Sequence, residues 1–201
     1  MLLHALIPAS RANGPGLRAV VFFQGCTLGC PGCWNPETHQ FHGTEVTVDA
    51  VAQEVLRAHT EQTLEGVTFS GGEPMQQVDS LLGLMQRLRR QAPELSFGMF
   101  SGYTERELPL GRYWTWGRDS SESPMCDLWR EIRAQLDFAI LGRFNAAQPS
   151  RLPLRTSRNQ VLRLFSGRYT AGDFSHELVE VTVHEGGRAE VTGFPVLGLP
   201  W

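Results

Sequence analysis

Three cysteines lie close together in the first part of the sequence. Cys26, Cys30 and Cys33 have the spacing C-x3-C-x2-C and follow an apolar run, residues 19–23, that predicts a buried strand. Cysteine thiolates are the usual ligands of iron–sulfur clusters, and a cubane cluster contains four irons. Three cysteines would leave one of these irons without a protein ligand. The spacing therefore predicts a 4Fe–4S cluster with an open iron, where a further molecule can bind.

Glycines alternate with these cysteines, at Gly25, Gly29 and Gly32. Glycine adopts left-handed backbone conformations with little steric penalty, so such a loop can turn three sulfurs toward one object.

Other uses of the cysteines stay open. A zinc site usually has four ligands, and here the fourth would be Cys126 or a distant histidine. A disulfide is disfavoured, because we expect a reducing cytoplasm and find no recognisable signal peptide. A zinc module or a non-enzymatic electron-transfer module therefore remains an alternative to an enzyme.

The overall composition limits the class of protein. The chain has 201 residues, 41% of them hydrophobic and 19% charged, as expected of one globular domain with its own core. We find no apolar stretch of the length that crosses a membrane. The formal net charge of −3 gives no general attraction to nucleic acid. We expect a cytoplasmic protein with neither a membrane partner nor general nucleic-acid binding.

The elements that must position the cysteine loop alternate between strands and helices. Thr47 is the predicted N-cap of the first helix. Such alternation predicts an α/β fold with mostly parallel strands, in which ligands bind at the carboxyl ends of the strands. Strands are predicted at 2–7, 17–23, 67–70, 95–100, 137–141 and 159–165, helices at 48–56, 78–88 and 128–136, a long loop at 109–125, and a C-terminal β-hairpin at 179–191.

Two more glycine-containing loops follow predicted strands, at residues 70–74 and 101–104. We expect both to meet the cysteine loop at one edge of the sheet. Gly71 and Gly72 would let a ligand approach the main chain, while Glu73 would supply a carboxylate for a ligand ammonium group. The amino acid end of S-adenosylmethionine would suit both this carboxylate and an open iron.

The sequence resembles the radical S-adenosylmethionine enzymes, and more narrowly the activating enzymes of glycyl-radical enzymes. The likeness is greatest to the activating enzymes of anaerobic (class III) ribonucleotide reductase. The stretches that carry it are 13–16 with Arg18, 24–26, 30–35, 68–74, 101–104 with 107–108, and 155–160.

This resemblance implies an incomplete, open β/α barrel of the radical S-adenosylmethionine type. Residues 1–165 would form its core, and residues 166–201 would be a C-terminal hairpin and tail packed on the same domain. Cys26, Cys30 and Cys33 would hold the 4Fe–4S cluster. The residues expected to contact S-adenosylmethionine are Ser70, Gly71, Gly72, Glu73, Ser101, Gly102, Tyr103 and Asn159.

The resemblance also implies a reaction. One electron from a flavodoxin- or ferredoxin-like donor would cleave S-adenosylmethionine, and the resulting radical would take a hydrogen atom from a glycine of a glycyl-radical enzyme. No catalytic side chain beyond the cluster and cofactor is expected, and Cys126 would be a spare thiol. Residues 109–125 and 166–201 depart from the family pattern. They leave open a radical enzyme that modifies a peptide, nucleotide or small metabolite.

Overall fold

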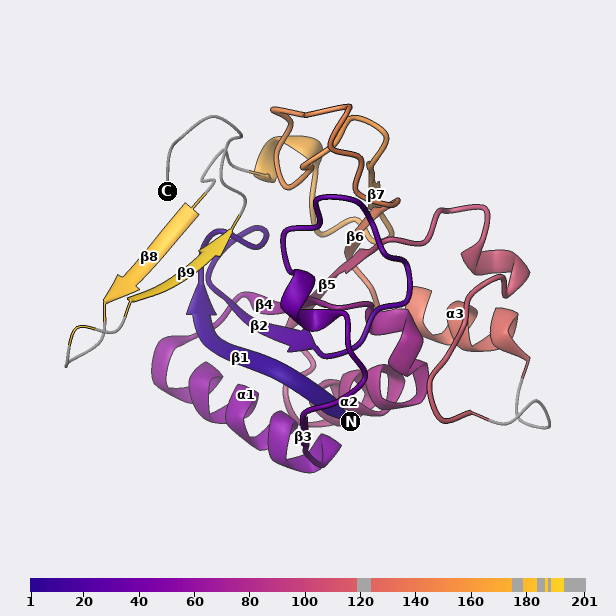
Figure 1. Cartoon of the computed structure of the whole chain (residues 1–201). Helices are drawn as coiled ribbons and strands as arrows, with labels where there is room; N and C mark the ends of the chain where they lie inside the picture. The colour runs from indigo at the N-terminus through magenta and orange to yellow at the C-terminus, as the bar shows by residue number, and fades with distance from the viewer. Residues whose placement is uncertain (119–123, 175–178, 184–186, 188, 194–201) are drawn as a thin grey trace.

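The centre of the molecule is a seven-stranded sheet with the strand order β3-β1-β2-β4-β5-β6-β7 (Figure 1). A computed structural model describes residues 1–118, 124–174, 179–183, 187 and 189–193. Four neighbouring strands are parallel: β2 (Arg18–Phe23), β4 (Gly66–Gly71), β5 (Ser96–Ser101) and β6 (Phe138–Leu141).

Antiparallel strands flank this parallel centre on both sides. They are β1 (Leu2–Ser10) and β3 (Thr44–Glu45) at one edge and β7 (Val161–Leu164) at the other. The helices are α1 (Val48–Gln62), α2 (Val78–Gln91) and α3 (Met125–Arg133). The prediction of an α/β fold with a mostly parallel sheet is confirmed.

Local sequence signals explain where the helices begin. The Thr47 hydroxyl accepts a hydrogen bond from the Ala50 amide at 3.1 Å, so the predicted N-cap of α1 is confirmed. Pro74 opens a 3₁₀ turn, Pro74–Gln77, and α2 begins only at Val78. No helix among the described residues combines the length and the apolar character that a membrane span requires.

The two faces of the sheet have different coverings. Alternate strand residues on one face pack with residues of α1, α2 and α3 into the main hydrophobic core. These strand residues are Ala19, Val21, Phe23, Val67, Phe69, Phe97, Met99, Ala139 and Leu141. Figure 1 shows α1 and α2 side by side below the sheet. The opposite face carries a smaller apolar cluster, which consists of Phe138, Ile140, Leu154, Tyr169 and Phe174.

A buried arginine closes part of that opposite face. Arg18 is fully buried at the start of β2, with its guanidinium 5.1 Å from the centre of the Phe138 ring. It donates to the Thr68 hydroxyl at 2.8 Å, to the Ser96 hydroxyl at 2.7 Å and to main-chain carbonyls of Pro15, Val67 and Ser96. The planar guanidinium thus joins three neighbouring segments with one side chain.

A two-stranded antiparallel sheet, β8 (Val179–Val183) and β9 (Ala189–Gly193), forms near the C-terminus. It corresponds to the predicted hairpin, although most of the expected turn at 185–188 lies outside the described residues. Figure 1 shows this hairpin beside the end of β1. The Asn13 side-chain amide donates to the Thr192 hydroxyl at 2.8 Å, which ties the hairpin to the chain segment after β1.

Residues 109–118 of the long loop predicted at 109–125 are held by local contacts, and residues 119–123 lie outside the described residues. The loop opens with a 3₁₀ turn, Leu108–Leu110, and α3 begins at Met125. Trp114 and Trp116 both pack against Phe41, with ring centres 5.1 and 6.1 Å away. This segment therefore lies against the chain that follows the cysteine loop.

Replacing Arg18 tests the closure of the open face. We expect Arg18→Met to lower the free energy of unfolding by about 3 kcal/mol or more, because several buried acceptors would lose their donor. Arg18→Lys should also destabilise, by about 2 kcal/mol, since lysine lacks the planar fork. Urea unfolding of the full chain measures both.

Arg57→Met is the matched control. Arg57 lies on the surface and pairs with Glu54 and Glu61, so its loss should leave the unfolding midpoint close to that of the wild type. Equal unfolding midpoints for the Arg18 and Arg57 variants would contradict this role of Arg18.

Candidate functional site

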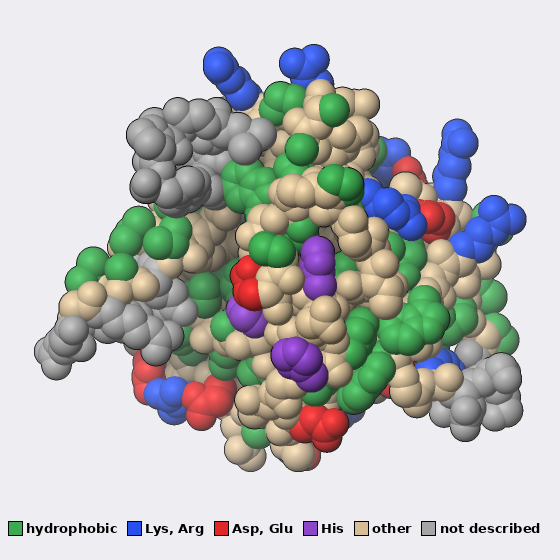
Figure 2. Space-filling view, viewed as in Figure 1, with side chains coloured by type: hydrophobic (Ala, Val, Ile, Leu, Met, Phe, Trp, Pro, Cys, Tyr) green, Lys and Arg blue, Asp and Glu red, His purple; other side chains and the backbone are tan. Residues whose placement is uncertain are grey.

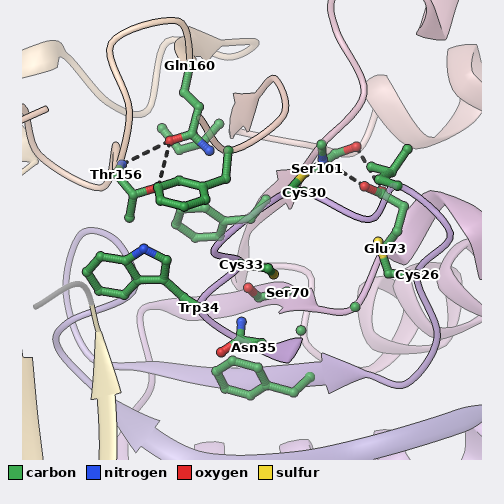
Figure 3. A pocket seen from close by; sticks show the side chains of 18 of the residues that line it. Cys26, Cys30, Cys33, Trp34, Asn35, Ser70, Glu73, Ser101, Thr156 and Gln160 are labelled. Atoms are coloured by element: carbon green, nitrogen blue, oxygen red, sulfur yellow. Dashed lines mark hydrogen bonds between the residues drawn. The ribbon is translucent and has the colours of Figure 1, made fainter. Parts of the chain in front are cut away.

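The carboxyl ends of the four parallel strands border a cavity of about 460 Å³ (Figure 3). Each strand contributes one lining residue from the face opposite the helices. Phe22 pairs with Ser70 across β2 and β4, and Phe100 pairs with Ile140 across β5 and β6. The cavity therefore lies where the sequence analysis expected ligands to bind, and it has the size of a typical small-molecule site.

All three clustered cysteines line this cavity. The loop around them turns through glycines with positive φ angles, +108° at Gly25 and +57° at Gly29. Main-chain bonds hold its ends: the Cys26 amide donates to the His39 carbonyl at 3.0 Å and the Cys33 amide to the Cys30 carbonyl at 3.1 Å. The segment after the loop thus braces it, and the contribution of His39 is its carbonyl group.

Burial makes the thiolate forms of Cys26 and Cys33 unfavourable when no metal is bound. Burial, with a smaller contribution from Glu73, raises the pKa of Cys26 to about 12, and burial also raises the pKa of Cys33. Metal binding must therefore displace protons from these thiols. Among the described residues no three His, Cys, Asp or Glu side chains form a compact site for a single metal ion. A cubane does not need that compactness, because each sulfur binds a different iron.

Glu73 joins the loop after β4 to the loop after β5. It is almost completely buried. Its Oε1 accepts bonds from the Ser101 hydroxyl at 2.8 Å and the Met75 amide at 3.0 Å, and its Oε2 accepts one from the Gly102 amide at 2.7 Å. Burial raises the pKa of Glu73 to about 7 despite these three donors. Figure 3 shows the carboxylate with Ser101 at the edge of the cavity.

Gly72 fits directly against the cysteine loop. A β-carbon on Gly72 would overlap the main chain of Gly25, the residue before Cys26. The Gly72 amide donates to the Phe23 carbonyl at 2.8 Å, and the Glu73 amide donates to the Gly25 carbonyl at 2.9 Å. The glycine therefore permits close approach of two chain segments, whereas the sequence analysis had assigned it to approach by a ligand.

A buried glutamine also connects the cysteine loop to the loop after β5. Gln76 is fully buried, and its Oε1 accepts from the amide of Thr27, the residue after Cys26, at 2.9 Å. Its Nε2 donates to the Thr27 hydroxyl at 2.7 Å and to the Tyr103 hydroxyl at 2.8 Å. The Gln76 carbonyl accepts from the Trp116 amide at 2.8 Å. Gln76 thus links the cysteine loop, the Tyr103 loop and residues 109–118, which we call the inserted segment.

Most of the predicted site residues come together around the cavity. Two do not line it. Tyr103 lies in the main core behind Gln76, and Asn159 is exposed, with its side-chain amide donating to the Arg143 carbonyl at 2.7 Å. The predicted residues that line the cavity are Cys26, Cys30, Cys33, Ser70, Gly71, Gly72, Glu73, Ser101 and Gly102.

Other lining residues were not predicted as site residues. Some belong to stretches that carried the family resemblance, which was the available signal: Asn13, Trp34, Asn35, Thr156 and Gln160. Residues of the C-terminal hairpin had no such signal: Val191, Thr192 and Gly193. Their position depends on contacts between distant parts of the chain.

Cys126 lies apart from the cluster cavity, on α3. It lines a second cavity of about 360 Å³ together with Trp129 and Phe165. This placement agrees with its interpretation as a spare thiol, since the described structure gives it no contact with the three clustered cysteines.

Comparison with known proteins identifies relatives of the whole core. The 4Fe-4S single cluster domain family matches residues 12–163. The anaerobic ribonucleoside-triphosphate reductase-activating protein of Haemophilus influenzae is 30% identical over 164 residues, which cover 79% of this chain and 94% of the relative. Its Escherichia coli K12 counterpart is 31% identical over 112 residues, covering 54% of this chain and 73% of the relative.

A second group of relatives matches a smaller part of this chain. The pyruvate formate-lyase-activating enzyme of Clostridium pasteurianum is 37% identical over 92 residues, which cover 44% of this chain and 39% of the relative. Because the family match spans most of the chain and the Haemophilus influenzae relative aligns along nearly its full length, the chain belongs to the 4Fe-4S single cluster domain family and to the family of the anaerobic ribonucleoside-triphosphate reductase-activating proteins.

Proposed function

We propose that this chain is a radical S-adenosylmethionine enzyme that forms a glycyl radical on a protein substrate such as anaerobic ribonucleotide reductase. One observation carries the proposal. Three cysteines in C-x3-C-x2-C spacing, the Gly-Gly-Glu loop and the Ser101-Gly102 loop border a single cavity, in a chain of the reductase-activating family.

Cys26, Cys30 and Cys33 would hold a 4Fe–4S cluster in this proposal, and the cavity that they line would take S-adenosylmethionine beside it. Bound together, the two cofactors would supply the one-electron chemistry that removes a hydrogen atom from the substrate. The side chains that surround them bind, orient and exclude water. Phe22, Phe100, Ile140 and Phe144 provide an apolar wall for that purpose.

Glu73 has a defined remaining capacity for a ligand. A carboxylate has about four acceptor positions, and three are used by Met75, Ser101 and Gly102. The position left can accept from the ammonium group of S-adenosylmethionine. A nearby cation favours the ionised carboxylate, so binding would lower the pKa of Glu73 from about 7.

The other predicted contacts divide into two groups. Ser70, Gly71, Gly72, Ser101 and Gly102 line the cavity and would contact the cofactor directly. Tyr103 and Asn159 would act by holding the cavity wall, through Gln76 and the Arg143 carbonyl respectively. No side chain is required as a general acid or base.

We also propose that the sheet is an open barrel of the radical S-adenosylmethionine type, with the cavity on its inner face. Residues 1–165 would form its core and residues 166–201 would pack on it. The helices on one sheet face and the cavity on the other support this arrangement. A flavodoxin- or ferredoxin-like donor would supply the electron, in the cytoplasm.

The test is anaerobic reconstitution of the full chain with iron and sulfide, followed by reduction in the presence of S-adenosylmethionine. The reductase encoded in the same genome, deuterated at glycine, should transfer deuterium into 5′-deoxyadenosine and show a glycyl radical by electron paramagnetic resonance. Cleavage of S-adenosylmethionine with no transfer from the reductase would favour a peptide, nucleotide or metabolite substrate. Absence of any cleavage would indicate a non-enzymatic module.

Single cysteine variants test the ligand set. Cys26→Ala, Cys30→Ala and Cys33→Ala should each lose most of the cluster and reduce S-adenosylmethionine cleavage by at least about 100-fold, since a cubane bound by two thiolates is poorly held. Iron content and 5′-deoxyadenosine formation are measured. Cys126→Ala is the control and should retain both. Full activity of Cys30→Ala would contradict the assignment.

Gly72→Ala tests the contact between the two loops. We expect it to lower the reconstituted iron content to less than about half and to destabilise the chain by about 2–4 kcal/mol, because the new β-carbon displaces the main chain before Cys26. Thermal unfolding and iron analysis measure the effect.

Gly29→Ala is the matched control in the cysteine loop. A β-carbon there has open space around it, and only its φ of +57° is unfavourable, by about 1 kcal/mol. Iron content should stay near the wild-type value. Equal losses in the two variants would argue against the special role of Gly72.

A further inference from the structure

The C-terminal hairpin has one face that is entirely apolar. In its ladder Val179 pairs with Gly193, Val181 with Val191, and Val183 with Ala189. Because directly paired residues lie on the same side of a sheet, the four valines share one face. We call this surface, made of Val179, Val181, Val183 and Val191, the valine face. Figure 2 shows hydrophobic side chains gathered over β8 and β9.

The valine face is exposed to solvent, which is unusual for a group of apolar side chains. The exposed fractions are 39% for Val179, 58% for Val181, 70% for Val183 and 51% for Val191. Neighbouring exposed valines on one surface are a typical sign of an interaction site.

The other face of the hairpin is attached to the body of the protein. Thr192 is 7% exposed, and its hydroxyl accepts from the Asn13 amide group at 2.8 Å. Glu180 accepts from the Arg11 amide through its Oε2 at 3.0 Å. Both residues alternate with the valines along their strands, so these bonds attach the hairpin to the body through the face opposite the valines.

The hairpin is also part of the cluster cavity. Val191, Thr192 and Gly193 of β9 line it, whereas no described residue of β8 does. The valine face therefore begins at the cavity wall, at Val191, and continues outward to β8. A molecule that reaches the cavity from this side passes over the valines.

We propose that the valine face is the docking surface for the polypeptide segment that delivers the target glycine to the cavity. This inference rests on the proposed function and names the surface that the protein substrate uses. The continuity of the face with the cavity wall supports it, because a glycine inside the cavity has neighbours in the chain that must lie just outside.

The chemistry of the surface favours a polypeptide as its occupant. Each strand has five residues, which span about 16 Å and match an extended segment of about five residues. The described residues of the face carry no charge, so they suit apolar side chains. Among the described residues, each strand of this two-stranded sheet has one edge without a ladder partner, and such edges recognise extended main chain. A metabolite that fits the cavity needs no surface beyond it.

Charged substitutions at the centre and outer end of the face provide the test. Val181→Glu and Val183→Glu replace side chains that are more than half exposed, so the free chain can accept them. With dithionite as reductant and the reductase of the same genome as substrate, the apparent KM for the reductase should rise at least about tenfold. Cleavage of S-adenosylmethionine without the reductase should stay within about twofold of wild type.

Two further variants make the result specific. Leu110→Glu, at a residue with 61% exposure in the inserted segment, should leave the KM for the reductase unchanged. Val181→Thr keeps the β-branched shape and adds one polar group, so it should raise the KM by only about threefold. This graded response separates a docking effect from unfolding of the hairpin.

The outcomes distinguish this inference from the function on which it rests. If the wild-type chain forms no radical on the reductase, the proposed function fails, and this inference fails with it. If it does, and both glutamate variants keep the wild-type KM, only the docking surface is wrong. A wild-type dimer that dissociates in Val181→Glu without a change in KM would assign the face to a second copy and likewise overturn the inference.

Discussion

The close approach of Gly72 to Gly25 is the contact on which the rest of the site depends. Two strand ends, β2 and β4, must bring their loops together so that cysteines and the Gly-Gly-Glu loop share a cavity. Only a residue without a β-carbon fits there, and the Glu73 amide then bonds the Gly25 carbonyl. The cysteine loop is thereby fixed to the sheet, and the positions of the parallel strands determine where its sulfurs lie. The precision of the site follows from main-chain packing.

Buried polar side chains also connect these two loops to the loop that follows β5. Glu73 connects to Ser101 and Gly102, while Gln76 connects Thr27 to Tyr103. Such networks are strong in a low-dielectric interior only if nearly all members are paired, and these are. Both residues stand within four positions of Gly72 in the sequence. One short segment after β4 therefore organises all three loops.

Local patterns predicted a large part of this structure. Strand runs, the Thr47 cap and the cysteine spacing are readable because their causes lie within a few residues. Prediction was incomplete where distant segments meet. The packing of Gly72 against Gly25 was not predicted, because the two residues are 47 positions apart in the sequence. Tyr103 follows a strand as expected, yet its ring turns into the core to meet Gln76. The hairpin was predicted as two strands, but its contribution to the cavity depends on Asn13, more than 170 residues earlier.

The same reasoning locates the features that can vary within the family. Helices cover one face of the sheet, and on the other face Arg18 with Phe138 closes one end and leaves the carboxyl ends open. The reactive chemistry belongs to the cofactors, so it places few demands on side chains beyond ligation and orientation. Selection among substrates must then come from whatever borders the opening. In this chain that border includes β9, which belongs to the segment beyond residue 165 that departs from the family pattern. Under the proposed function, the radical chemistry and the choice of target therefore depend on different parts of this chain.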